Sequence, residues 1–176
     1  NGEKNYHSIG EVVDNGLFFT LIIALFSFII LQFLSPILFE KIITSHSIYL
    51  ASVEYISWRS YGIFFGLINA SLIAFYIGTK STWVLAWTTV LLTVSNIFLD
   101  YAMIFGHFGF PAWGVKGAAV ATVLSEALVS FLLIIYTLKT IDLKSYNLFN
   151  YLNIKKETVK SILTTSGPMM IQSFVS

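Results

Sequence analysis

The stretch "LFFTLIIALFSFIILQFLSPILF", Leu17–Phe39, contains no charged residue. A helix needs about 20 mostly apolar residues to cross a lipid bilayer, and this run is long enough. Lipid cannot satisfy exposed backbone groups, and the run lacks the alternation of a barrel strand, so a helix is the expected form. The stretch therefore predicts a membrane-spanning helix, which we expect Pro36 to end or kink.

Further apolar runs follow along the chain. We expect spans at about residues 17–39, 53–77, 83–105 and 115–138, with the start of a fifth at 162–176. Between the first two, residues 40–60 are mixed in character and predict a surface helix that leads into the second span. The expected fold class is an all-α polytopic helical membrane protein with four complete transmembrane helices. Because residue 176 falls inside an apolar run that has barely begun, we expect a longer chain.

The composition excludes several classes of protein. Hydrophobic residues make up 56% of the 176 and charged residues 11%, whereas soluble domains carry about 25% charged residues. The net charge of +1 offers no basic field for nucleic acid. Cysteine is absent from the sequence, which excludes disulfides and thiolate metal sites. We find no Walker loop, nucleophile triad or histidine metal motif, so we expect neither an enzyme nor an organic cofactor.

Lysine and arginine indicate the orientation, because cytoplasmic loops carry more of them. With alternating spans, one side receives Lys4, Lys80, Lys139, Lys144, Lys155, Lys156 and Lys160, and the other receives Lys41, Arg59 and Lys116. We therefore expect the N-terminal segment and the linker at residues 139–161 to face the cytoplasm. Part of this linker alternates apolar and charged residues, which fits either an interfacial amphipathic helix or a solvated linker.

The third span carries a polar stripe. Thr89, Thr93, Asn96 and Asp100 are spaced by four, three and four residues, so they share one helix face. An ionised Asp at the centre of a span costs about 2.5–3.5 kcal/mol. A proton, a bound cation or a basic partner would offset this cost, and Arg59 and Lys116 both lie at helix ends. A proton or a metal ion is therefore favoured; hydration at the interface or a structural hydrogen bond is the alternative.

The fourth span places Thr122 and Glu126 one turn apart, after the small residues "GAAVAT", Gly117–Thr122. Small residues let two helices approach closely. The loop Gly106–Gly114 makes the third and fourth spans antiparallel neighbours, so a carboxylate, an amide and a hydroxyl converge. These hard oxygen ligands suit Na⁺. Helix–helix hydrogen bonding explains Thr122 equally well.

The run "NIFLDYAMIFGHFGFPAWGVKGAAVAT", Asn96–Thr122, resembles the multidrug and toxic compound extrusion (MATE) transporters. The family pattern is Asn-x-x-x-Asp, then a Gly-x-Pro-x-x-Gly-Val loop, then Gly-Ala-Ala-x-Ala-Thr. The matching residues after Asp100 are Gly109, Pro111, Gly114, Val115, Gly117, Ala118, Ala119, Ala121 and Thr122. Looser matches are Tyr55, Arg59 and Gly62, and the "SGPMMIQ" near the end.

The resemblance implies twelve spans in two lobes. Residues 1–138 would then belong to the N-terminal lobe as spans three to six, residues 139–161 would be the cytoplasmic inter-lobe linker, and residues 162–176 would begin the C-terminal lobe. The family's sodium-binding members imply a cation site formed by Asn96, Asp100, Thr122 and the backbone carbonyl of Ala118. That site also uses an Asp of the first span, which this sequence lacks. We further expect Glu126 and Gln172 to line the cavity.

The function expected from the resemblance is secondary antiport by alternating access. Organic, often cationic, compounds would be exported in exchange for Na⁺ or H⁺, by a monomer in the plasma (inner) membrane. The expected partners are a small-molecule substrate and the lipid bilayer. The alternatives are a lipid-linked glycan flippase of the same superfamily and a structural membrane segment without transport activity. Arg59 is expected to anchor the interface or to pack between helices.

Overall fold

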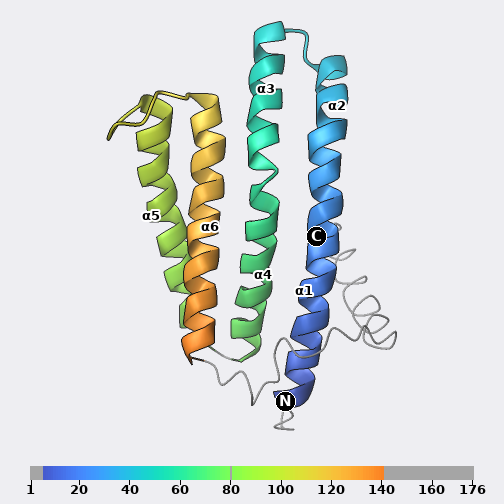
Figure 1. Cartoon of the computed structure of the whole chain (residues 1–176), viewed down its shortest axis with the longest axis vertical. Helices are drawn as coiled ribbons and strands as arrows, with labels where there is room; N and C mark the ends of the chain where they lie inside the picture. The colour runs from blue at the N-terminus through green and yellow to red at the C-terminus, as the bar shows by residue number, and fades with distance from the viewer. Residues whose placement is uncertain (1–5, 80, 141–176) are drawn as a thin grey trace, which may run out of the picture. The chain divides into compact units, whose positions relative to one another are not determined.

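The computed structural model describes residues 6–79 and 81–140 (Figure 1). By its contacts the chain divides into two units, one of residues 1–19 and 140–176 and the other Thr20–Lys139. Only residues 6–19 and 140 of the first unit are described, so the contacts discussed below belong to the second. Three predictions fall outside the described residues. They are the linker beyond residue 140, the start of a further span at 162–176 and the cavity residue Gln172.

The regular elements of the described residues are all helical. In chain order they are α1 (Tyr6–Ile29), the π-helix η1 (Ile30–Leu34), α2 (Ser35–Ile42), α3 (His46–Arg59), α4 (Gly62–Gly78), α5 (Trp83–Phe105) and α6 (Val115–Thr140). Within residues 6–79 and 81–140, three continuous stretches are long and apolar enough to cross a membrane: Asn15–Ile42, Trp83–Phe105 and Val115–Thr140. The pair α3 and α4 passes the same criterion as one bent helix. The predicted class, an all-α polytopic membrane protein, is confirmed.

The first candidate span continues through Pro36 instead of ending there. Proline has no N–H, and in a regular α-helix its ring would clash with the carbonyl four residues earlier. The π-helix η1 directly precedes it, and the N–H of Ser35 donates to the carbonyl of Ile30, five residues back. This wider turn accommodates the ring, and Pro36 then sits in the first turn of α2, where an N–H is not needed.

The second candidate span is bent rather than straight. Helices α3 and α4 meet at an angle of 45° at Ser60 and Tyr61. The hydroxyl of Ser60 donates to the carbonyl of Ser57 at 2.9 Å, a backbone contact that is typical of bent helices. A helix is present within residues 40–60: it is α3, which begins at His46 and runs across the bend into α4 as part of the second candidate span.

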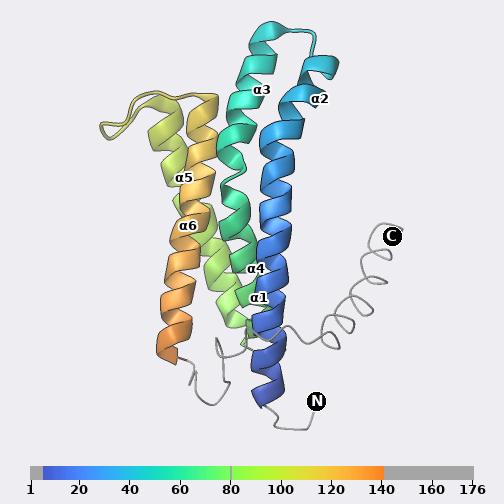
Figure 2. The same ribbon diagram turned by 45° about the vertical axis from the view of Figure 1, so that its right-hand side comes forward.

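Within the second unit, α5 and α6 run side by side, and α2 and α3 form a second antiparallel pair (Figures 1 and 2). Helix α6 also contacts α4, where the hydroxyls of Tyr76 and Thr137 lie 2.8 Å apart and are buried. The side chains buried between α5 and α6 are small or flexible, whereas large apolar side chains such as Phe26, Trp87 and Phe131 are exposed. Such a distribution suits a protein surrounded by lipid, where close packing of small residues holds helices together.

Candidate cation site between α5 and α6

The loop between α5 and α6 fixes how the two helices meet. Helix α5 ends at Phe105, and the next residue, Gly106, adopts the left-handed conformation with φ of 76° that glycine tolerates best. A Cβ on Gly106 would also lie only 2.9 Å from the backbone nitrogen of Ala112. The N–H of Trp113 donates to the carbonyl of Met103 at 2.9 Å, and the N–H of Gly114 donates to that of Ile104 at 3.2 Å. The chain is thereby folded back on the end of α5 before α6 begins.

Small residues at the start of α6 allow close packing on α5. A Cβ on Gly117 would lie 2.7 Å from the carbonyl carbon of Met103, so this position requires glycine. Ala119 and Ala121 are fully buried, and Ala121 forms a core cluster with Ala102 and Met103. The predicted close approach at "GAAVAT" is confirmed.

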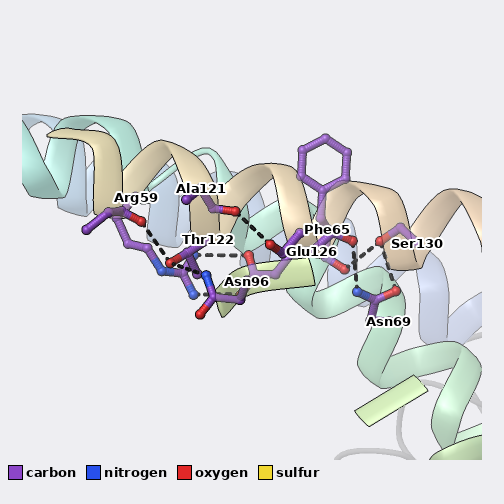
Figure 3. Close-up of polar contacts among 10 residues, drawn as sticks. Arg59, Phe65, Asn69, Asn96, Ala121, Thr122, Glu126 and Ser130 are labelled. Carbon is purple, nitrogen blue, oxygen red and sulfur yellow. Dashed lines mark hydrogen bonds and ion pairs between the residues drawn. The ribbon is translucent and has the colours of Figure 1, made fainter. Parts of the chain in front are cut away.

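This packing brings three of the predicted site residues together. The side-chain amide of Asn96 on α5 donates to the hydroxyl of Thr122 on α6 at 3.3 Å. That hydroxyl in turn donates to the backbone carbonyl of Ala118 at 2.9 Å (Figure 3). The amide of Asn96, the hydroxyl of Thr122 and the carbonyl of Ala118 therefore form one hydrogen-bonded chain between α5 and α6.

Asp100 lies one turn further along α5, and its side chain is half-buried. Its Oδ1 atom is buried and has no hydrogen-bond partner in the part of the chain that the structure describes. A buried carboxylate oxygen without a donor is costly, and native proteins rarely leave one. Asp100 thus lies one turn from Asn96 on α5 and makes no hydrogen bond to Asn96 or Thr122.

The ligand set suits a hard cation or a proton. Carboxylate, amide, hydroxyl and carbonyl oxygens are the atoms that bind such cations. Over residues 6–79 and 81–140, no group of three or more His, Cys, Asp or Glu side chains could hold a metal ion. A cation at this place would have Asp100 as its carboxylate ligand, with neutral oxygens as the others. The unpartnered Oδ1 of Asp100 fits this role.

Glu126 has a partner that the sequence did not indicate. The guanidinium of Arg59, at the end of α3, donates from its two terminal nitrogens to the two carboxylate oxygens of Glu126, at 2.8 and 3.1 Å (Figure 3). Gly62 makes room for this pair, because a Cβ there would collide with both side chains. Arg59 thus packs between helices, which is the second of the two roles considered for it.

Two further polar residues join α4 to α6. The amide nitrogen of Asn69 donates to the backbone carbonyl of Glu126 at 3.1 Å. The hydroxyl of Ser130 lies 2.9 Å from the amide oxygen of Asn69 and 3.1 Å from the carbonyl of Phe65 (Figure 3). Ser130 lies four residues after Glu126, so helical spacing in the sequence places it on the same face of α6 as Glu126. Asn69 stands alone in an apolar run, and no pattern in the sequence indicates its contact with α6.

The other members of the α5 stripe are placed differently. Thr89 and Thr93 are exposed, and their hydroxyls donate to backbone carbonyls four residues back in the same helix, at 2.9 Å each. The stripe therefore has two parts. Asn96 contacts α6, whereas the hydroxyls of Thr89 and Thr93 bond only within α5.

Comparison with known proteins shows which family the chain belongs to. The MatE family model matches residues 1–102, which include Asn96 and Asp100. The chain is 44% identical over 82 residues to a probable multidrug resistance protein NorM of Thermotoga maritima, an alignment that covers 46% of this chain and 17% of that protein.

Two more relatives with the same description match almost the whole chain. The one from Synechocystis sp. is 25% identical over 171 residues, and the one from Listeria innocua is 30% identical over 170 residues. These alignments cover 97% and 95% of this chain, but only 37% of each relative. The chain thus spans less than two fifths of the length of these relatives. The resemblance read from the sequence is confirmed: the chain belongs to the MatE family.

Proposed function

We propose that this chain is part of a secondary antiporter that exports small organic, often cationic, compounds in exchange for Na⁺ or H⁺. The names of its relatives support export of multiple drugs. The observation that carries the coupling role is the buried, unpartnered Oδ1 of Asp100, beside the contact between Asn96 and Thr122. A carboxylate in this position would take up the coupling ion together with Asn96, Thr122 and the carbonyl of Ala118.

Neutralisation of Asp100 supplies a physical link between ion and transport. An ionised carboxylate is expensive in a low-dielectric environment, and a proton or a bound cation removes most of that cost. Two conformations that expose Asp100 to different surroundings would therefore change in relative free energy when the ion binds. Alternating access by two lobes around a midplane cavity is the mechanism that fits this coupling.

The proposed setting follows from the loop charges. We propose that the protein lies in the plasma (inner) membrane as a monomer, with the N-terminal segment and residues 139–161 in the cytoplasm.

The basic residue that contacts α6 near Thr122 is Arg59, and Glu126 already neutralises it. A pyrophosphate-linked glycan would need free positive charge in the cavity, so a flippase is the less favoured alternative.

The test uses the full-length transporter in proteoliposomes and export of a fluorescent organic cation. A Na⁺ gradient at equal pH and a pH gradient without Na⁺ separate the two coupling ions. We expect Asp100→Asn to abolish gradient-driven export, because the amide cannot bind either ion as a carboxylate does. Glu40→Gln, at an exposed site on α2, is the matched control and keeps export at the native rate. Unchanged export by Asp100→Asn under both gradients rules out the proposed role.

A further inference from the structure

Helix α6 contacts three other helices on successive turns. Thr122 contacts Asn96 of α5, Glu126 pairs with Arg59 of α3, and Ser130 contacts the residues of α4 described above. These α6 residues are spaced by four, so each lies about one turn from the next. A helix is stiff over such a short distance. A displacement of α6 that changes the position of Thr122 against α5 therefore also displaces Glu126 against Arg59.

The Arg59–Glu126 pair sits at the bend between α3 and α4. Arg59 is the last residue of α3, and the 45° bend follows it directly. On the α4 side, Asn69 and Tyr76 attach the helix to α6 through hydrogen bonds. On the α3 side, the contacts with α6 and its first turn come from Arg59 and from Trp58, whose ring centre lies 4.9 Å from the Nζ of Lys116.

A groove on α3 leaves space for the helix to change its angle. This groove has a volume of about 610 Å³ and lies between α2, α3 and the first residue of α6. Its lining includes Phe39, Ile48, Ser52, Tyr55 and Val115. A change in the bend at Ser60 could therefore bring α3 closer to the start of α6 without displacing tightly packed side chains.

We propose that Arg59 and Glu126 form a latch that couples the candidate cation site to the angle between α3 and α4. The latch is the two-point ion pair between the two side chains, and Gly62 provides the room for it. If the ion binds more tightly when the latch is closed than when it is open, ion binding shifts the latch toward its closed state. By thermodynamic linkage, closing the latch then raises the ion affinity by the same factor. This inference rests on the proposed function, since it needs an ion to bind beside Thr122.

The test measures the distance between α3 and α6 in the full-length protein. Spin labels replace Glu54 on α3 and Phe131 on α6, both exposed, and pulsed electron resonance gives the distance distribution. NaCl at fixed pH is one titrant, and acid without Na⁺ is the other. Single replacements leave an unpaired, part-buried charge and can fail to fold, so the main variant is the neutral double replacement Arg59→Gln with Glu126→Gln. Its matched control is Lys41→Gln with Glu40→Gln, an exposed pair on α2.

We expect the latch variant to shift or broaden the ion-free distance distribution and to change the half-maximal ion concentration by about fivefold or more. The control should follow the native protein in both measures. A latch variant with the native distribution and the native ion midpoint overturns the proposal. A changed distribution with an unchanged ion midpoint also overturns it, because the pair would then be a structural contact only.

Asp100→Asn with an intact latch separates this proposal from the proposed function. If this variant keeps the native ion response, the proposed cation site is wrong, whatever the latch variant does. If Asp100→Asn loses the response and the latch variant keeps the native midpoint, the cation site stands and the latch is wrong.

Discussion

The guanidinium of Arg59 donates two hydrogen bonds to the carboxylate of Glu126, although the residues are 67 positions apart in the chain. The side chains are 30% and 12% exposed, so both charges are largely removed from water. Removing a charge from water costs free energy, and the two-point geometry and opposite charges offset that cost. The pair therefore joins the bend of the second candidate span to α6.

Replacement of Gly62 should test how closely the chain fits around this pair. A Cβ at position 62 would collide with the ends of both charged side chains. These flexible ends can move aside, so Gly62→Ala should lower the free energy of unfolding by only about 1 kcal/mol, through the disturbed hydrogen bonds of the pair. Gly66, one turn later on α4, is the matched control. A Cβ there would lie 3.8 Å from the nearest atom of Glu126, an ordinary contact. Unfolding in mixed detergent micelles measures both variants. Equal stability of the two variants would show that the two-point contact between Arg59 and Glu126 contributes no measurable stability.

The contact between α5 and α6 should depend on Gly117. A Cβ at this position would meet backbone atoms of Met103 and Ile104, which cannot rotate away. We therefore expect Gly117→Ala to lower the free energy of unfolding by about 1–3 kcal/mol, and to weaken ion binding by displacing Thr122 from Asn96. The control is Gly78→Ala, where a Cβ would have no neighbour within 4 Å. A Gly117→Ala variant with native stability and native ion affinity would exclude the close packing described for these helices.

Asn69 should contribute to the attachment of α4 to α6. Asn69→Leu removes its hydrogen bonds to the carbonyl of Glu126 and to the hydroxyl of Ser130. Hydrogen bonds between membrane helices contribute about 0.6 kcal/mol each on average, so the expected loss is about 1 kcal/mol. Thr93→Val is the control, because the hydroxyl of Thr93 is exposed and bonds within its own helix. The same unfolding assay applies, and a loss no larger than that of the control would argue against the contact.

Much of the helical architecture follows from local properties of the sequence. The predicted third span, residues 83–105, coincides with α5, because apolar length and the left-handed Gly106 define both of its ends. The contact of Thr122 with Asn96 follows from the short loop and from helical spacing. The effect of Pro36 was harder to predict, because a proline can either end a helix or be accommodated by a π turn, and surrounding packing decides.

The Arg59–Glu126 pair could not be predicted in the same way. Arg59 stands near the end of a mixed segment, where an interfacial arginine is common. Glu126 lies on α6, and two helices, α4 and α5, separate it from α3 along the chain. Their contact depends on the bend at Ser60 and on the space at Gly62, and both are properties of the folded chain. Asn69 was missed for a related reason: a single amide in an apolar run does not reveal which neighbouring helix it faces.

The claim on which the account depends is that Asp100 binds the coupling ion. Direct binding to purified full-length protein tests it, with radioactive Na⁺ at fixed pH and proton uptake on acidification without Na⁺ as the two readouts. We predict that the native protein and Glu40→Gln either bind Na⁺ saturably or, in the absence of Na⁺, take up a proton on acidification, and that Asp100→Asn does neither. Saturable Na⁺ binding or proton uptake by Asp100→Asn with native affinity would contradict the role proposed for Asp100.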